Sequence, residues 1–114
     1  MARFMAIKAQ GDGQLPSSKG TLYTVPTATQ AIIRTITLVN TSSAEVKVNL
    51  YLRLDGTNSR RILPKDMKLR ATQNGGMAVD DNVHTLEAGD LLEGDAATAS
   101  AVDFVIEGTE ETAA

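Results

Sequence analysis

A two-residue alternation of apolar and polar side chains over residues 31–54 constrains the fold of this chain more than any other feature. In its second half Val46, Val48, Leu50, Leu52 and Leu54 alternate with Lys47, Asn49, Tyr51 and Arg53. This is the period of a β-strand with one buried face and one wet face. Ile36 and Leu38 repeat it in the first half, and the polar run at 40–43 separates the halves. The pattern predicts an antiparallel hairpin.

Shorter segments of the same period continue along the rest of the chain. Pro26 and Pro64 close two of them, since proline cannot donate to a strand ladder. The turns and the spacing predict about eight short strands, roughly 8–12 residues apart. We therefore expect an all-β fold, an antiparallel β-sandwich of jelly-roll or immunoglobulin-like type. Aromatic side chains make up only 4% of the residues, so Val, Ile, Leu and Ala must build the core.

The length of 114 residues indicates one domain. We expect residues 1–14 to form an N-terminal arm or edge strand, residues 15–108 the sandwich, and residues 109–114 a flexible acidic tail. The chain has no cysteine, which excludes disulfides and Cys-ligated metals. No apolar run approaches the roughly 20 residues that cross a bilayer, so we expect no membrane contact.

Charge is divided unevenly along the chain. All 11 Lys and Arg residues lie within residues 3–70, whereas 10 of the 14 Asp and Glu residues follow residue 70. Opposite charges could pair across strands inside one fold, or positive and negative ends could join neighbouring copies. In the second case the assembly would weaken as salt rises.

No residue set indicates a reaction. His84 is the single histidine, and a nucleophilic triad would need a positioned hydroxyl and a carboxylate beside it. Asp80-Asp81-Asn82 offers oxygen ligands but lacks the spacing of a calcium loop, so a solvated turn is the better interpretation. We expect no catalytic residue, no cofactor and no metal, and hence no enzyme.

A basic stretch is the best candidate for partner contact. It consists of Arg60, Arg61, Lys65, Lys68 and Arg70, opposed in the sequence only by Asp66. β-type nucleic-acid binders add stacking aromatics, and this stretch has none. Because the whole chain is acidic, the stretch favours an acidic protein surface over nucleic acid.

Several segments together resemble a family of small virion proteins of tailed bacteriophages. They are Gly20-Thr21-Leu22-Tyr23-Thr24-Val25-Pro26, the strand Ile33–Asn40 with its end Leu38-Val39-Asn40-Thr41, Val48-Asn49-Leu50-Tyr51-Leu52, Leu86-Glu87-Ala88-Gly89-Asp90 and the strand Val102–Gly108. The order and spacing of these pieces carry the resemblance, which covers about residues 15–108. It implies a β-sandwich that serves as a structural part of a virion.

The resemblance leads to a specific expectation of function. We expect a capsid decoration or cement protein, made in the host cytoplasm and placed on the capsid surface, which binds the major capsid protein or other virion proteins. Such units form closed homo-oligomers, commonly trimers. The alternatives are a tail, fibre or head–tail junction component, or a receptor- or carbohydrate-binding module. A sugar site usually offers an exposed aromatic ring, and here only Tyr23 and Tyr51 could serve.

Overall fold

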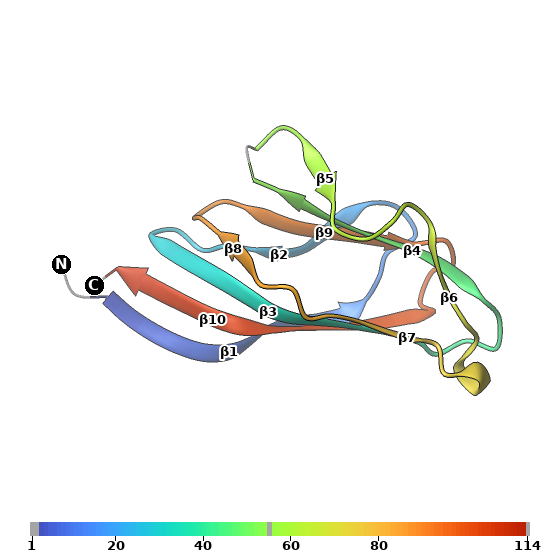
Figure 1. Ribbon diagram of the computed structural model, residues 1–114. Helices are drawn as coiled ribbons and strands as arrows, with labels where there is room; N and C mark the ends of the chain where they lie inside the picture. Colours follow the sequence, from blue (N-terminus) through green and yellow to red (C-terminus); the bar gives the residue numbers. More distant parts are fainter. Residues whose placement is uncertain (1–2, 55, 114) are drawn as a thin grey trace.

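The computed structural model describes residues 3–54 and 56–113 and shows two β-sheets packed face to face (Figure 1). The elements are β1 Arg3–Gln14, β2 Gly20–Thr24, β3 Thr29–Asn40, β4 Val46–Arg53, β5 Ser59–Arg61, β6 Met67–Leu69, the 3₁₀ turn η1 Thr72–Asn74, β7 Met77–Asp80, β8 His84–Leu86, β9 Leu91–Ala96 and β10 Val102–Ala113. The all-β fold predicted from the alternation is confirmed. No helix in the described ranges is long and apolar enough to cross a membrane.

The strand order is that of a jelly roll. The first sheet runs β1-β10-β3, and β7 and β8 both pair with the far side of β3. The second sheet runs β2-β9-β4, and β5 and β6 both pair with β4. All strand pairs are antiparallel. Together they form one long nested hairpin that is rolled up, in which β1 pairs with β10, β2 with β9, β3 with β7 and β8, and β4 with β5 and β6. Of the two predicted sandwich types, the structure adopts the jelly roll.

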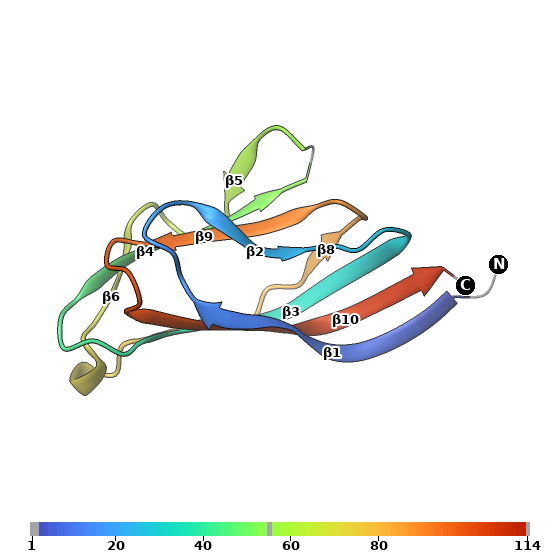
Figure 2. The same cartoon turned by 180° about the vertical axis from the view of Figure 1, so that it is seen from behind.

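The predicted count of about eight strands matches the number of strand positions in the two sheets. β5 and β6 occupy successive stretches beside β4, and β7 and β8 do the same beside β3. Each sheet is therefore four strands wide, and its fourth strand is divided into two short pieces. The interrupted positions lie on the same side of the sandwich (Figures 1 and 2).

The hairpin predicted over residues 31–54 is wrong. β3 and β4 belong to different sheets and face each other across the core, where Ile36 and Leu38 pack with Val48 and Leu50. Alternation shows only that one face of each strand is buried, and it does not distinguish pairing within a sheet from packing between sheets. The segment after Asn40 turns the chain from one sheet to the other.

The flexible acidic tail predicted for residues 109–114 is instead, up to Ala113, the end of β10. This strand lies between β1 and β3 and pairs with both, with Thr112 opposite Phe4 on one side and Thr29 on the other. Glu110 is buried there at 8% exposure. Acidic composition suggested disorder, but pairing on both sides holds this segment in the sheet. Ala114 lies outside the described residues.

β1 is the outer strand of the first sheet and, among the described strands, pairs only with β10. The ends of β1 and β10 project past the second sheet at one tip of the molecule, as both views show (Figures 1 and 2). Strand β1 has a bulge between Ala9 and Gly11, and β10 has one between Glu107 and Gly108. Bulges at these positions along β1 and β10 bend the first sheet where it extends past the second.

Candidate functional site

The basic stretch predicted for partner contact lies along one edge of the second sheet. Arg60 and Arg61 belong to β5, Lys68 belongs to β6, and Lys65 and Arg70 flank β6. Both strands pair with β4, so the residues share one edge, and all five are exposed. The structure thus brings the predicted residues together. Their contact with a partner stays a prediction.

A polar cluster centred on Tyr51 covers part of the outer face of the second sheet. Lys19 Nζ lies 5.2 Å and Arg61 Cζ 4.9 Å from the centroid of the Tyr51 ring. The Tyr51 hydroxyl donates to Asp95 Oδ2 at 3.1 Å. Burial, and then the hydrogen bond to Asp95, raise the pKa of Tyr51. Two cations thus lie near the ring, which is buried rather than offered to solvent.

Asn49 ties this cluster to the turn before β6. Its Nδ2 donates to Asp95 Oδ1 at 2.8 Å and to Asp66 Oδ1 at 3.1 Å. Its Oδ1 accepts from the Asp66 backbone N–H at 2.8 Å and from Arg61 Nη1 at 2.5 Å. Arg61 and Asp66 are exposed, but each is bonded to Asn49 of the same chain. Sequence reasoning missed this cluster because its members come from distant segments and leave no local signal.

Neither tyrosine considered for sugar binding is open to a ligand. Tyr51 is 9% exposed and Tyr23 is 8% exposed. The Tyr23 hydroxyl donates to the Glu110 carboxylate between the sheets. Burial, followed by the bond to Glu110, raises the pKa of Tyr23 well above its ordinary value. Both rings are parts of the folded framework, which removes the feature that supported a carbohydrate-binding module.

The outer face of the first sheet exposes several large apolar side chains. Ile7 on β1 is 92% exposed and Met5 is 69% exposed. Val105 of β10 and Val79 of β7 add to them, and both stand opposite Thr37 of β3 in the pairing register. Exposed apolar residues that gather on one sheet face mark an interaction surface more often than single ones do. The signal in the sequence was the alternation of Met5 and Ile7, but it could not show that this face stays uncovered.

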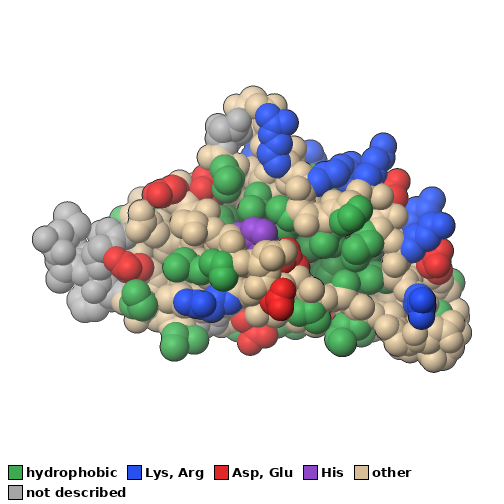
Figure 3. Space-filling model, in the orientation of Figure 1, with side chains coloured by type: hydrophobic (Ala, Val, Ile, Leu, Met, Phe, Trp, Pro, Cys, Tyr) green, Lys and Arg blue, Asp and Glu red, His purple; other side chains and the backbone are tan. Residues whose placement is uncertain are grey.

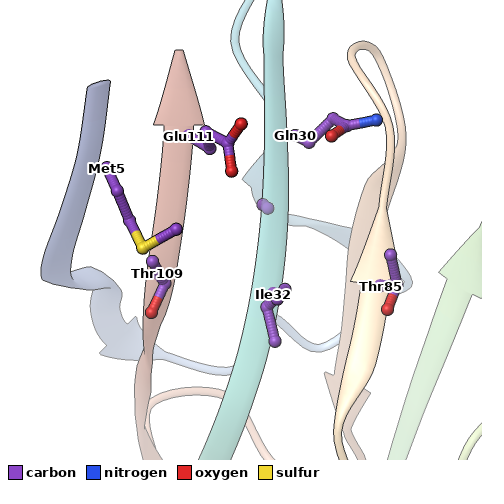
Figure 4. Close-up of a pocket in the computed structure, with 7 residues that line it drawn as sticks. Met5, Gln30, Ile32, Thr85, Thr109 and Glu111 are labelled. Carbon is purple, nitrogen blue, oxygen red and sulfur yellow. The ribbon is translucent and has the colours of Figure 1, made fainter. Parts of the chain in front are cut away.

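A shallow cavity of about 110 Å³ indents this face near the projecting tip (Figure 4). Met5 from β1 and Thr109 from β10 line one side, and Ile32 from β3 and Thr85 from β8 line the other. Glu111 and Gln30 stand at its upper end, and Gln30 also donates to Glu87 at 3.2 Å. Mixed apolar and polar walls suit contact with another protein surface.

His84 and Asp80 form a pair at the end of β7 and the start of β8. His84 Nε2 lies 3.0 Å from Asp80 Oδ2, and Asp80 Oδ1 accepts from the Asn82 backbone N–H at 3.0 Å. Asp80 therefore joins the two short strands instead of presenting open ligand positions. In the described part of the chain, no group of three or more His, Cys, Asp or Glu side chains is placed to hold a metal ion.

The strand order places the chain in a class: it is a jelly-roll protein with a fold like that of viral capsid proteins. No protein-family model matches it, and no curated protein matches its sequence. Its fold is similar to that of a chain in the structure of infectious bursal disease virus strain Gx, with a TM-score of 0.53 and 13% identity over 97% of this chain and 33% of that chain. It is also similar to a chain of the acid-stable capsid of Helicobacter pylori bacteriophage KHP30, with a TM-score of 0.50 and 8% identity over 99% of this chain and 100% of the other.

The same fold occurs in an assembly that is not a virus. A chain of the disulfide-linked pili of Bacillus endospore appendages matches with a TM-score of 0.52 and 13% identity, over 99% of this chain and 88% of that chain. At such identities the likeness concerns the fold alone. The resemblance to virion proteins of tailed bacteriophages therefore has support at the level of a viral capsid-like fold, and the particular family stays a prediction.

Proposed function

We propose that this chain is a structural protein of a bacteriophage virion that decorates the capsid surface and braces the major capsid shell. The observation that carries the proposal is the exposed apolar outer face of the first sheet, which includes Met5, Ile7, Val79 and Val105. A face of this kind needs a protein partner, because leaving large apolar side chains in water forgoes their burial energy. No catalytic role is part of the proposal.

Two surfaces of different chemistry allow two kinds of contact. The apolar face of the first sheet would join copies of the chain into a closed homo-oligomer, for which a trimer is a common symmetry on capsids. The basic edge of the second sheet, with Lys65, Lys68 and Arg70, would meet an acidic surface of the major capsid protein. Each contact with the shell can be weak, since the oligomer engages several sites at once.

The similarity to a KHP30 capsid chain over its full length supports the proposal, because a jelly roll of this size is one component of that phage particle. The pilus similarity favours a rival, a tail, fibre or other filament subunit. The two functions differ in where the chain is found. A decoration protein coats heads, and a filament subunit is confined to appendages.

The deciding experiment separates purified particles into heads and tails and detects the chain in each fraction by mass spectrometry, followed by cryo-electron microscopy of the positive fraction. We expect the chain on heads, with regular density outside the shell. Its presence in tails alone, or its absence from both fractions, would overturn the proposal. Synthesis in the host cytoplasm predicts that the unassembled protein appears in the soluble fraction of infected cells.

The role of the apolar face has its own test, the variant Ile7→Glu with Leu54→Glu as the matched control. Both side chains are exposed, at 92% and 52%, and Leu54 lies just after β4 in the other sheet. Sedimentation should show loss of the oligomer for Ile7→Glu and no change for Leu54→Glu. Equal behaviour of the two variants would exclude this face as the contact between copies.

A further inference from the structure

An apolar slot of about 100 Å³ opens at the interrupted edge of the sandwich, between β6 of one sheet and β7 of the other. Its lining comes from both sheets and reaches the core: Ile36, Leu38, Leu50, Leu63, Met67, Ala78, Val79 and Asp80. Figure 3 shows this edge, where hydrophobic side chains gather beside the single histidine and below a row of Lys and Arg side chains. The slot adjoins the outer face of the first sheet at Val79, which belongs to both.

The chemistry of the slot suits an aliphatic side chain. Asp80 is its one ionisable member, and both carboxylate oxygens are already bonded, one by the Asn82 backbone N–H and the other by His84. A water molecule occupies roughly 30 Å³ of liquid, and a dry cavity of roughly 150 Å³ accepts benzene. A slot between these sizes, with an apolar floor, fits one Val or Leu side chain.

The strands beside the slot leave backbone groups available. β6 pairs only with β4, and β7 pairs only with β3, within the described part of the chain. Alternate N–H and C=O groups of a strand at a sheet edge point away from the sheet and can pair with an added strand. An added strand also points every second side chain inward. Backbone pairing and a filled slot can therefore occur together.

The rim of the slot is basic on the side of the second sheet. Lys65 and Lys68 flank Met67, which lines the slot, and Lys68 stands opposite Lys47 in the register between β4 and β6. All three lysines are exposed, and no acid of the described residues lies within ion-pairing distance of them. An added strand would place its outward side chains near these lysines. Acidic residues at those positions would complement the rim.

We propose that this slot binds an extended segment of a partner protein, added as a strand, whose apolar side chain fills the slot and whose acidic side chains face Lys65 and Lys68. The mode is β-strand addition, in which backbone bonds supply affinity and a pocket for alternate side chains supplies specificity. The identity of the partner as the major capsid protein rests on the proposed function. The site itself does not.

The test uses a fluorescent synthetic peptide that alternates Glu with Val and carries Leu at its centre. Two control peptides replace the central Leu by Ser, or each Glu by Lys. We expect anisotropy to report saturable binding of the first peptide, and binding at least about tenfold weaker, equivalent to about 1.4 kcal/mol, for each control. Binding of the Ser peptide as tightly as the Leu peptide, or no binding of the Leu peptide, would overturn the proposal.

Variants of the chain locate the binding. Ala78→Leu fills the slot from β7, and the double variant Lys65→Glu with Lys68→Glu reverses the rim at exposed positions where folding is not at stake. Arg34→Glu is the matched control, because Arg34 is exposed on β3 of the other sheet. We expect about tenfold weaker binding for the first two and less than about a twofold change for the control. Unchanged binding by the rim variant refutes the site even if Ala78→Leu fails to fold.

The outcome separates this inference from the proposed function. If the chain is found on heads and the Leu peptide does not bind, the slot proposal fails and the proposed function stands. If the peptide binds as expected and the chain is absent from heads, the proposed function fails and the slot remains a protein-binding site.

Discussion

Replacement of Asn40 should destabilise the fold by about 2–4 kcal/mol, although this residue lies in no surface patch. Asn40 is fully buried at the end of β3, where the chain leaves the first sheet. Its Nδ2 donates to Ala44 O at 2.8 Å and Arg70 O at 2.9 Å, and to Leu69 O at 3.3 Å. Its Oδ1 accepts from both the backbone N–H and the hydroxyl of Ser42. One side chain thus joins the corner between the sheets to the end of β6.

The magnitude follows from what Asn40→Ala leaves behind. A buried carbonyl without a partner costs about 1–3 kcal/mol, and the small cavity adds to that loss. Those terms give about 2–4 kcal/mol in all. At about 4 °C per kcal/mol for a domain of this size, the melting temperature should fall by about 8–16 °C. Calorimetry or thermal circular dichroism measures the fall, with exposed Asn74→Ala as a control that should change little.

Asn40→Asp sharpens the test, because it keeps the shape of the side chain. It replaces the amide N–H₂, which donates to three carbonyl oxygens, by a carboxyl oxygen. Burial would raise the pKa of the new carboxyl above its unfolded value of about 3.9. A raised folded pKa costs stability as pH rises above the unfolded value, so the deficit should be small near pH 4 and large near pH 7. A melting temperature within about 2 °C of the unchanged protein for Asn40→Ala, or a deficit of Asn40→Asp that is the same at both pH values, would refute the reasoning.

Three further predictions concern packing, titration and salt. Gly76→Ala should lower the free energy of unfolding in urea by about 2–3 kcal/mol, because a Cβ there would lie 1.8 Å from Arg70 O. Gly11→Ala is the control: its Cβ would meet only ordinary contacts at 3.4 Å and beyond, so the free energy should change little. Because the pKa of Tyr23 is raised, the folded protein retains a proton that the unfolded chain releases above about pH 10. The urea midpoint of unfolding should therefore fall between about pH 10 and 11, and it should fall less in Tyr23→Phe. An equal fall in both proteins would exclude Tyr23 as the cause. Raising salt from about 0.05 to 0.5 M should weaken attachment to heads through Lys65, Lys68 and Arg70, which head co-purification measures. The apolar contact between copies should stay intact, which sedimentation measures. An oligomer that dissociates with salt would contradict the apolar contact.

The sequence predicted the fold class because one physical rule, the two-residue period, operates in every strand. It could not predict which strands share a sheet, since Ile36 and Val48 look the same whether they lie side by side or face each other across a core. It also predicted that Glu110 belongs to a flexible tail, because composition alone does not reveal that a tyrosine hydroxyl of the opposite sheet binds its carboxylate. The five basic residues were found as a group because they are close in the sequence. The slot was not, since its walls come from both sheets.

The uneven distribution of charge acquires a definite meaning once the fold is known. Several of the acids that follow residue 70 are used inside the molecule, as partners of polar groups: Asp80 with His84, Asp90 with the Glu87 backbone, Glu93 with Ser59, Asp95 with Asn49 and Tyr51, and Glu110 with Tyr23. In the pairing register Glu93 of β9 and Arg61 of β5 both stand opposite Tyr51, one on each side of β4, so these two charges are separated by a strand. The exposed surface keeps a basic edge around Lys65 and Lys68 on the second sheet, and on the first sheet it keeps large apolar side chains together with acids such as Glu107. Folding therefore engages part of the negative charge expected from the sequence, and the exposed basic edge remains the surface best suited to an acidic partner.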